Sequence, residues 1–160
     1  MQIRKTIPSD AEELTKLIKK LETSDNYLSE KQQQIRAFSD LEKAAEKAAE
    51  RYISQPGYVS FVADENGALK GFIAGEVKEK KYRVYNKEGY VELWFVEPEY
   101  QGQSVGKKLF DMLAEEFKKL GCTHITLDTH LENSKAIQIY EHMGFTKRLI
   151  TFFKPLNDQK

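Results

Sequence analysis

Cysteine and proline are scarce in this sequence, which has one cysteine, Cys122, and four prolines among 160 residues. A single cysteine excludes an internal disulfide and any metal site built from several cysteines. Basic and acidic side chains are equal in number, at 25 each, so the chain lacks the basic surplus typical of nucleic-acid-binding proteins. These scarcities favour a reducing, cytoplasmic setting and give no reason to expect a nucleic-acid partner.

Long hydrophobic runs are also missing. No stretch approaches the ~20 apolar residues that a membrane-spanning helix needs. The opening "MQIRKTIPSD" lacks the apolar centre of a secretion signal. We therefore expect no membrane partner. The length of 160 residues predicts one domain over residues 1–160, with enough chain to bury a core.

Apolar spacing predicts a short first strand in "MQIRKTI" and two helices after it. The first helix, over residues 8–22, has Ser9 and Glu12 in capping-box spacing. Its apolar face is formed by Leu14, Leu17, Ile18 and Leu21. The second helix has an apolar face formed by Leu41, Ala45, Ala48 and Tyr52. The breaker "SQPG" at Ser54–Gly57 ends it.

Three strand-like segments follow, at residues 58–64, 68–78 and 90–98, and the turn signals "ENG" and "YNKEG" between them predict antiparallel pairing. A helix over 104–121, a strand "HITLDTH", a helix over 132–145 and a last strand or two in "TKRLITFFKPL" complete the chain. The order β-α-α-β-β-β-α-β-α-β predicts the α/β (mixed α+β) class, with a central mixed, mostly antiparallel sheet flanked by helices. Residues 90–130 should form a parallel crossover.

The stretch "YQGQSVGKKL" places two of only nine glycines, Gly102 and Gly106, between a strand and a helix. Such a turn directs unpaired backbone N–H groups and the positive end of the helix dipole at one point, which suits an anion such as phosphate. Lys107 and Lys108 add positive charge. A plain strand-to-helix turn with surface lysines explains the pattern equally well. The spacing matches neither the P-loop nor G-x-G-x-x-G.

This stretch resembles the signature of the GNAT superfamily of N-acetyltransferases, in which Q/R-x-x-G-x-G/A follows a strand ending in V-x-P. Val96-Glu97-Pro98 and Gln101 to Gly106 fit that frame, except that Ser104 stands at the family's first glycine. A serine Cβ there would crowd a diphosphate. A second stretch, Asn133 to Phe145, resembles the family pattern N-x-x-A-x-x-x-Y-x-x-x-G-F. The tail after Phe145 is short for the usual final β-hairpin.

The resemblance implies acetyl-CoA as co-substrate and no metal. Its pantetheine arm is expected to bond with the backbone of Phe95 and Val96, in the manner of an added strand, and to approach Asn133. The diphosphate is expected on the turn residues Gln101, Gly102, Gln103, Ser104, Val105, Gly106 and Lys107.

The resemblance also implies a general acid, Tyr140, for the leaving thiolate. For the base that takes a proton from the amine we expect Glu92, in the middle of its strand, with Val91 and Leu93 pointing to the opposite face. His130 is the second choice. An ordinary half-exposed glutamate and a packed helix-face tyrosine are the alternative interpretations of Glu92 and Tyr140.

We thus predict an enzyme that moves the acetyl group of acetyl-CoA to a primary amine, either of a small molecule or of a lysine or protein N-terminus, by direct attack in a ternary complex. Asp25, Glu30 and Asp40 would suit a cationic amine such as a polyamine or aminoglycoside, but they are as readily a solvated surface. A non-catalytic CoA- or acyl-CoA-binding regulatory module is the alternative. Homodimers are frequent in the family, and no feature here specifies one.

Overall fold

A computed structural model describes residues 1–24 and 26–156 of the chain. These residues fall into two compact units, Met1–Asp128 and the part from Thr129 onward. The single domain over 1–160 stays a prediction, and Asp25 lies outside the described residues. Among the described residues, no helix has the length and apolar character needed to cross a membrane.

The first unit is built on one five-stranded sheet in the order β1-β2-β3-β4-β5. The strands are β1 Gln2–Lys5, β2 Tyr58–Glu65, β3 Ala68–Glu79, β4 Lys87–Val96 and β5 His124–Leu127. Neighbours from β1 to β4 are antiparallel, whereas β5 runs parallel to β4. The predicted mixed, mostly antiparallel sheet is therefore confirmed, as is the parallel pairing across the crossover.

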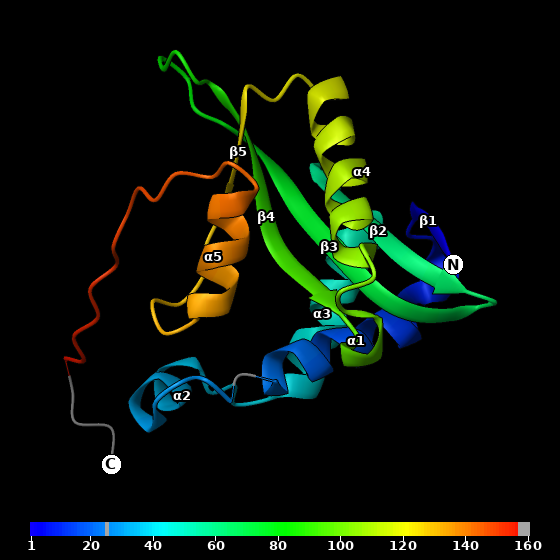
Figure 1. The fold of residues 1–160 in the computed structure, drawn as a ribbon, viewed down its shortest axis with the longest axis horizontal. Coiled ribbons are helices and arrows are strands. Elements are labelled where there is room, and N and C mark those ends of the chain that lie inside the picture. The colour runs from blue at the N-terminus through cyan, green and yellow to red at the C-terminus, as the bar shows by residue number, and fades with distance from the viewer. Residues whose placement is uncertain (25, 157–160) are drawn as a thin grey trace. The chain divides into compact units, whose positions relative to one another are not determined.

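Helices pack on both faces of this sheet (Figure 1). On one face lie α1 Ala11–Thr23 and α3 Leu41–Ser54, and on the other lies α4 Val105–Lys119. A short α2, Glu30–Arg36, occupies the stretch where the sequence shows only a weak pattern, and α5, Ser134–His142, belongs to the second unit. Two 3-10 turns, Pro8–Asp10 and Pro98–Tyr100, precede α1 and the glycine turn.

The core consists of two apolar layers, one on each face of the sheet. The layer against α1 and α3 centres on Leu14, Leu17, Ile18, Tyr52, Val62, Phe72 and Phe95. The layer against α4 centres on Phe61, Ile73, Val91, Val96, Leu109, Leu113 and Phe117. Both layers bury the apolar helix faces that the sequence predicts, because a helix on a sheet needs one apolar stripe facing it.

The start of α1 is not capped as predicted. Ser9 and Glu12 form no capping box; instead, the carboxylate of Asp10 accepts hydrogen bonds from the Ile7 N–H at 2.8 Å and from Arg4 at 2.8 and 2.9 Å. The guanidinium of Arg4, helped by the Ile7 N–H, holds the pKa of Asp10 below its usual range although burial opposes this. Arg4 also pairs with Asp64 on β2, so this network joins the beginning of α1 to the sheet.

The predicted strand in residues 146–156 is wrong. Residues 146–156 contain no strand, and large apolar side chains there, Leu149, Phe152 and Leu156, are at least 84% exposed. A strand needs a partner for its backbone N–H and C=O groups, and the only regular element of the second unit's described residues is α5. The strand expected to reach His130 also ends earlier, at Leu127.

A β-bulge interrupts the pairing of β3 with β4. Ala74 pairs with Leu93 and Gly75 with Val91, so Glu92 has no partner of its own. The extra residue turns the strand, and the alternation of faces shifts there. Val91 consequently packs in the α4 layer, whereas both Glu92 and Leu93 face α3. The expectation that Leu93 points away from the face of Glu92 is therefore wrong.

Candidate active site

The strand β4 loses one of its neighbours halfway along its length. Strand β5 pairs only with Glu88–Val91, and among the described residues no strand pairs with the outer side of Glu92–Val96. We call this outer side the open edge of β4. It offers backbone hydrogen-bonding groups to a ligand in the way that a sheet edge accepts an extra strand.

The hydrogen-bonding pattern between β3 and β4 determines which residues of β4 present their backbone N–H and C=O groups at the open edge. The Glu97 N–H donates to the Lys70 carbonyl at 2.9 Å, which makes Glu97 a hydrogen-bonded pair with β3. Such pairs recur at every second residue, so the backbone of Phe95 also points toward β3. Trp94 and Val96 therefore direct their N–H and C=O groups outward. By this geometry Trp94 and Val96, and not Phe95, present backbone groups at the open edge; which of these residues contact the pantetheine arm stays a prediction.

One of the outward groups already has a partner. The side-chain amide of Gln101 donates to the Val96 carbonyl at 3.0 Å, and the amide of Gln103 donates to the Glu99 carbonyl at 2.7 Å. These bonds fix the path of the chain between β4 and α4. The two glutamines thus act through their side chains in shaping the turn.

The turn exposes a row of backbone N–H groups. In the described part of the chain, no acceptor takes the N–H groups of residues 102–107, and Ser104, the N-cap of α4, makes no side-chain capping bond. Unpaired N–H groups at the start of a 15-residue helix form a site of positive potential. The Lys107 ammonium, largely exposed, pairs with Asp111 at 2.6 Å. This arrangement suits a phosphate group.

Ser104 adopts a left-handed backbone conformation, with φ of +61°. Residues other than glycine pay about 1–2 kcal/mol for this conformation, which explains why a glycine is the ordinary residue at this place in the family signature. Gly102, two residues earlier, also has a positive φ, of +77°. The turn therefore has two residues in the left-handed conformation. Gly102 adopts it without strain, whereas Ser104 adopts it with strain.

Gly106 lies beside the Trp94 ring and has room for a Cβ. A Cβ at this position would lie 3.6 Å from the Trp94 ring, an ordinary contact distance. Trp94 in turn stacks on Phe110 of α4, with ring centroids 5.5 Å apart. Together with Val105, which is buried, these contacts hold the first turn of α4 against the open half of β4.

Glu92 lies against the last turn of α3. Its carboxylate is 3.4 Å from a terminal nitrogen of Arg51, and its side chain is 21% exposed. Burial, followed by a hydrogen bond with Glu92, raises the pKa of Tyr52. The same carboxylate contributes to raising the pKa of Tyr58, for which burial is the first cause. Glu92 is thus a half-buried carboxylate in an aromatic surrounding, reachable by solvent.

Tyr140 and Asn133 belong to the second unit. Tyr140 contacts Phe145 edge to face, with centroids 6.1 Å apart, and burial raises the pKa of its phenol. A raised pKa keeps the phenol protonated at neutral pH, as a proton donor requires. Asn133 is the N-cap of α5, and its side-chain oxygen accepts from the Ala136 N–H at 3.1 Å. This capping bond gives a structural reason for the N-x-x-A spacing.

Two further reactive side chains are His130 and Cys122. His130 follows β5 in the loop before α5, within the second unit. Cys122 packs at the border of the α4 layer, and burial raises the pKa of its thiol, which disfavours a nucleophilic thiolate. Among the described residues, no group of three or more His, Cys, Asp or Glu is arranged to hold a metal ion.

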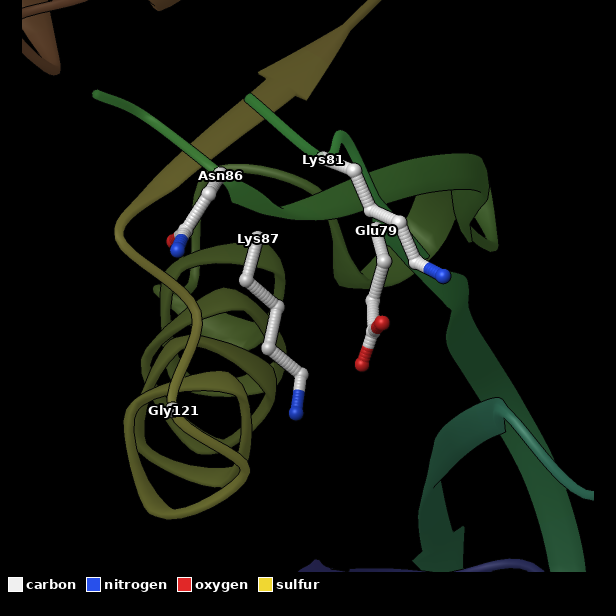
Figure 2. Close-up of a pocket in the computed structure, with 5 residues that line it drawn as sticks. All are labelled: Glu79, Lys81, Asn86, Lys87 and Gly121. Atoms are coloured by element: carbon white, nitrogen blue, oxygen red, sulfur yellow. The ribbon is translucent and has the colours of Figure 1, made fainter. Parts of the chain in front are cut away.

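A pocket of about 300 Å³ lies at the base of the β3–β4 hairpin, near the end of α4. Figure 2 shows the side chains that line it, those of Glu79, Lys81, Asn86 and Lys87, with Gly121 beside them. None of the residues that the sequence assigns to acetyl transfer belongs to this set. The pocket is therefore separate from the open edge and the glycine turn.

Two features of the site were missed in the sequence. The outward backbone of Trp94 has no local sequence signal, because it depends on the pairing of β4 with β3. Arg51 was not considered, since one basic residue in the last turn of a helix is ordinary. The pairing of β3 with β4 reveals the role of Trp94, and the contact with Glu92 reveals that of Arg51.

Comparison with known proteins gives the same assignment. The model of the Acetyltransferase (GNAT) family matches residues 17–145. N-alpha-acetyltransferase 30 of Schizosaccharomyces pombe is 31% identical over 81% of this chain and 86% of its own length. The Saccharomyces cerevisiae protein of that name is 33% identical over 51% of this chain, and the match spans only 46% of that protein.

Solved structures share the fold. The aminoglycoside N-acetyltransferase AAC(6')-Iy, determined in complex with CoA, superposes with a TM-score of 0.75 at 19% identity, covering 98% of this chain and 95% of the other. At this identity the likeness concerns the fold. The family model covers most of the chain, including the glycine turn and α5, and the chain belongs to the acetyltransferase (GNAT) family.

Proposed function

We propose that this protein is an N-acetyltransferase, which transfers the acetyl group of acetyl-CoA to a primary amine by direct attack in a ternary complex. The observation that carries the proposal is the row of unpaired N–H groups at residues 102–107, at the start of α4 and following the open edge of β4. An anion site joined to an open strand edge matches a ligand with a diphosphate at one end and an amide-bearing arm at the other.

The chain offers distinct groups for each part of acetyl-CoA. The backbone of Gln101 to Lys107 would hold the diphosphate, and Trp94 and Val96 would bond with the pantetheine arm. Asn133 would also contact the pantetheine arm. Its side-chain oxygen caps α5, so its amide nitrogen would make this contact. When bound, acetyl-CoA supplies an acyl group activated as a thioester. A backbone N–H of the open edge would polarise the acyl carbonyl.

Glu92 would serve as general base. An aliphatic amine has a pKa near ~10, so most of it is protonated at neutral pH and cannot attack. Glu92 offers a carboxylate on the strand that carries the open edge, and its position at the bulge brings it out of the regular pairing. His130 is the second candidate. The new C–N bond forms as the C–S bond breaks, and the amine's proton passes to the base.

Tyr140 would donate a proton to the departing thiolate. A thiolate is a moderate leaving group, with a thiol pKa of ~8.5, so this help is moderate too. The raised pKa of Tyr140 keeps its proton available. Its place in the N-x-x-A-x-x-x-Y pattern supports the role.

The names of the relatives support two acceptor classes. The N-alpha-acetyltransferases named above support a protein or peptide N-terminal amine, whereas the aminoglycoside enzyme supports a small amine. The sequence likeness to the former is higher, and we favour an α-amine. A cytoplasmic location and a homodimer stay predictions from the sequence.

The experiment is thiol release from acetyl-CoA against peptides with free N-termini, lysine peptides, small amines and aminoglycosides. Amine-dependent release that falls about ten-fold in Tyr140→Phe would support the enzyme and its acid. Calorimetry of acetyl-CoA binding runs beside it, with Lys47→Met on the exposed side of α3 as the control variant. Tight binding without release for any amine would favour the non-catalytic CoA-binding module instead.

A further inference from the structure

Arg51, in the last turn of α3, carries a guanidinium that the protein only partly engages. Its central carbon lies 5.1 Å from the ring centroid of Tyr52 and 5.3 Å from that of Tyr58. Both distances fall within the range of cation–π attraction. The two rings, 5.9 Å apart, therefore hold the guanidinium in a defined place beside Glu92.

The hydrogen bonds of Arg51 are few and long. One terminal nitrogen is 3.4 Å from both the Tyr52 hydroxyl and a Glu92 carboxylate oxygen. Well-formed bonds of this kind are about 2.7–2.9 Å long. The Nε is buried and has no hydrogen-bond partner. A guanidinium has five N–H donors, and apart from the buried Nε, donors on its terminal nitrogens are left for another group.

The charges on this face of the sheet are otherwise balanced. Glu76 pairs with Lys78 at 3.6 Å and Glu88 with Lys80 at 2.7 Å. Asp128 accepts a hydrogen bond from the Tyr90 hydroxyl at 3.0 Å. With Glu92 beside Arg51, three of these four carboxylates have a cation of the protein next to them. A polycationic acceptor would therefore meet little surplus negative charge here.

We propose that Arg51 binds an anionic oxygen group, a carboxylate or a phosphate, that the acceptor carries in addition to its amine. This inference rests on the proposed function, because it places the amine at Glu92. The planar fork of a guanidinium fits such groups with two parallel bonds. The anion would take the unused donors while Glu92 takes the proton of the amine. The substrate class is thereby narrowed to amines that carry an anionic group.

The test uses the full chain and matched acceptor pairs that differ in one charge. One pair is β-alanine and its amide, and the other is phosphoethanolamine and ethanolamine. A peptide pair with aspartate or asparagine at the second position extends the test to N-terminal amines. The ratio of kcat/KM within each pair is measured for the natural protein, Arg51→Met, Arg51→Lys and the control Lys47→Met, a lysine that is 70% exposed on the same helix.

We expect the natural protein and Lys47→Met to favour the anionic member by about ten-fold or more, mainly through KM, which corresponds to a charge-assisted hydrogen bond. Arg51→Met should lose the preference, and Arg51→Lys should keep part of it because the charge remains. Whichever pair shows the larger ratio identifies carboxylate or phosphate as the group. Equal use of both members, or a preference that survives Arg51→Met, would overturn the inference and leave the proposed function standing.

A second readout does not depend on activity. β-Alanine and phosphoethanolamine are titrated by calorimetry into the natural protein and Arg51→Lys in the presence of CoA. Binding of an anionic amine that weakens in Arg51→Lys supports the anion site even when no acetyl transfer occurs, in which case the proposed function alone fails. Absence of binding to the natural protein contradicts the site. Circular dichroism verifies that each variant is folded.

Discussion

The two halves of β4 have the same local structure and different surroundings. Glu88–Val91 pairs with β3 on one side and β5 on the other, whereas Leu93–Val96 pairs with β3 alone. The first half is therefore an internal strand that stabilises the sheet. The second half keeps outward backbone groups for a ligand. The comparison shows that one strand can carry both tasks when a single inserted residue separates them.

The side chains of the two halves differ in the same way. In the first half, Glu88 is 6% exposed, pairs with Lys80 and accepts a hydrogen bond from Thr126. In the second half, the contact of Glu92 with its cation, Arg51, is long, at 3.4 Å. A buried carboxylate with two partners holds structure together, and a half-buried one with a loose partner is available for proton transfer.

The largest expected effect separates these two glutamates. Glu92→Gln should lower kcat/KM for acetyl transfer by about a hundred-fold or more, because an amide cannot accept the amine's proton. Glu88→Gln should leave kcat/KM within about two-fold and instead lower the free energy of unfolding by about 1 kcal/mol. Steady-state thiol release and urea unfolding of both variants provide the measurements. A similar activity loss in both would remove the distinction between the halves.

The second prediction compares Gly89, within the first half of β4, with Gly106 of α4, which packs beside the second half. A Cβ on Gly89, in the first half, would lie 2.3 Å from the ring of Phe117, which is 1% exposed. Gly89→Ala should therefore cost about 3 kcal/mol of unfolding free energy through overpacking. Gly106→Ala, with its 3.6 Å contact to Trp94, should change it by less than about 1 kcal/mol. Equal unfolding midpoints in urea would contradict the packing argument.

A smaller effect is expected at the turn beside the open half. Ser104→Gly should raise the free energy of unfolding by about 0.5–1 kcal/mol, since the left-handed strain outweighs the extra entropy of glycine. Removal of the Cβ should also tighten acetyl-CoA binding, as measured by calorimetry. Ser104→Ala is the control, because it keeps the Cβ and the strain and loses only the hydroxyl. Binding that is tighter in Ser104→Ala than in Ser104→Gly would show that the hydroxyl, and not the Cβ, matters.

The smallest expected effect is the pH dependence of the unfolding free energy that Glu88 contributes in the first half of β4. Burial acts to raise the pKa of Glu88, but the ammonium of Lys80 and the hydroxyl of Thr126 outweigh it and hold this pKa below its ordinary value. The stabilisation is therefore complete above the unfolded pKa of about 4.3 and disappears as the pH falls through the folded pKa. The stability difference between the natural protein and Glu88→Gln should shrink between pH 7 and about pH 3. A constant difference would mean that the Lys80 pair contributes nothing.

Most of the fold could be predicted from the sequence because its signals are local. Helix faces such as that of Leu14 and Leu17, and the turn at Asn66-Gly67, reflect periodicity and backbone preference within a few residues. The glycine turn was found because it has both a motif and a physical reason. The predicted parallel pairing of β4 and β5 followed from the length of the connection.

The failures depend on distant neighbours. The bulge at Glu92 arises from pairing with Ala74 and Gly75 on another strand. No local sequence pattern therefore predicts that Glu92 and Leu93 lie on the same face of the sheet. The outward direction of the Trp94 backbone likewise depends on how β4 pairs with β3. The apolar and β-branched residues at 149–153 resemble a strand, but a strand forms only where a second one accepts its bonds. The role that we propose for Arg51 depends on its contact with Glu92, which lies 41 residues away in the sequence.

An exposed sheet edge is a hazard in any crowded solution, because a strand of another molecule can add to it. In this protein the outward groups of the open edge come from only two residues, Trp94 and Val96, and the side chain of Gln101 already covers the Val96 carbonyl. The turn Pro98–Tyr100 then ends the extended path. The edge is thus too short to template the pairing of a whole foreign strand, and the protein can keep a ligand-binding edge without inviting aggregation.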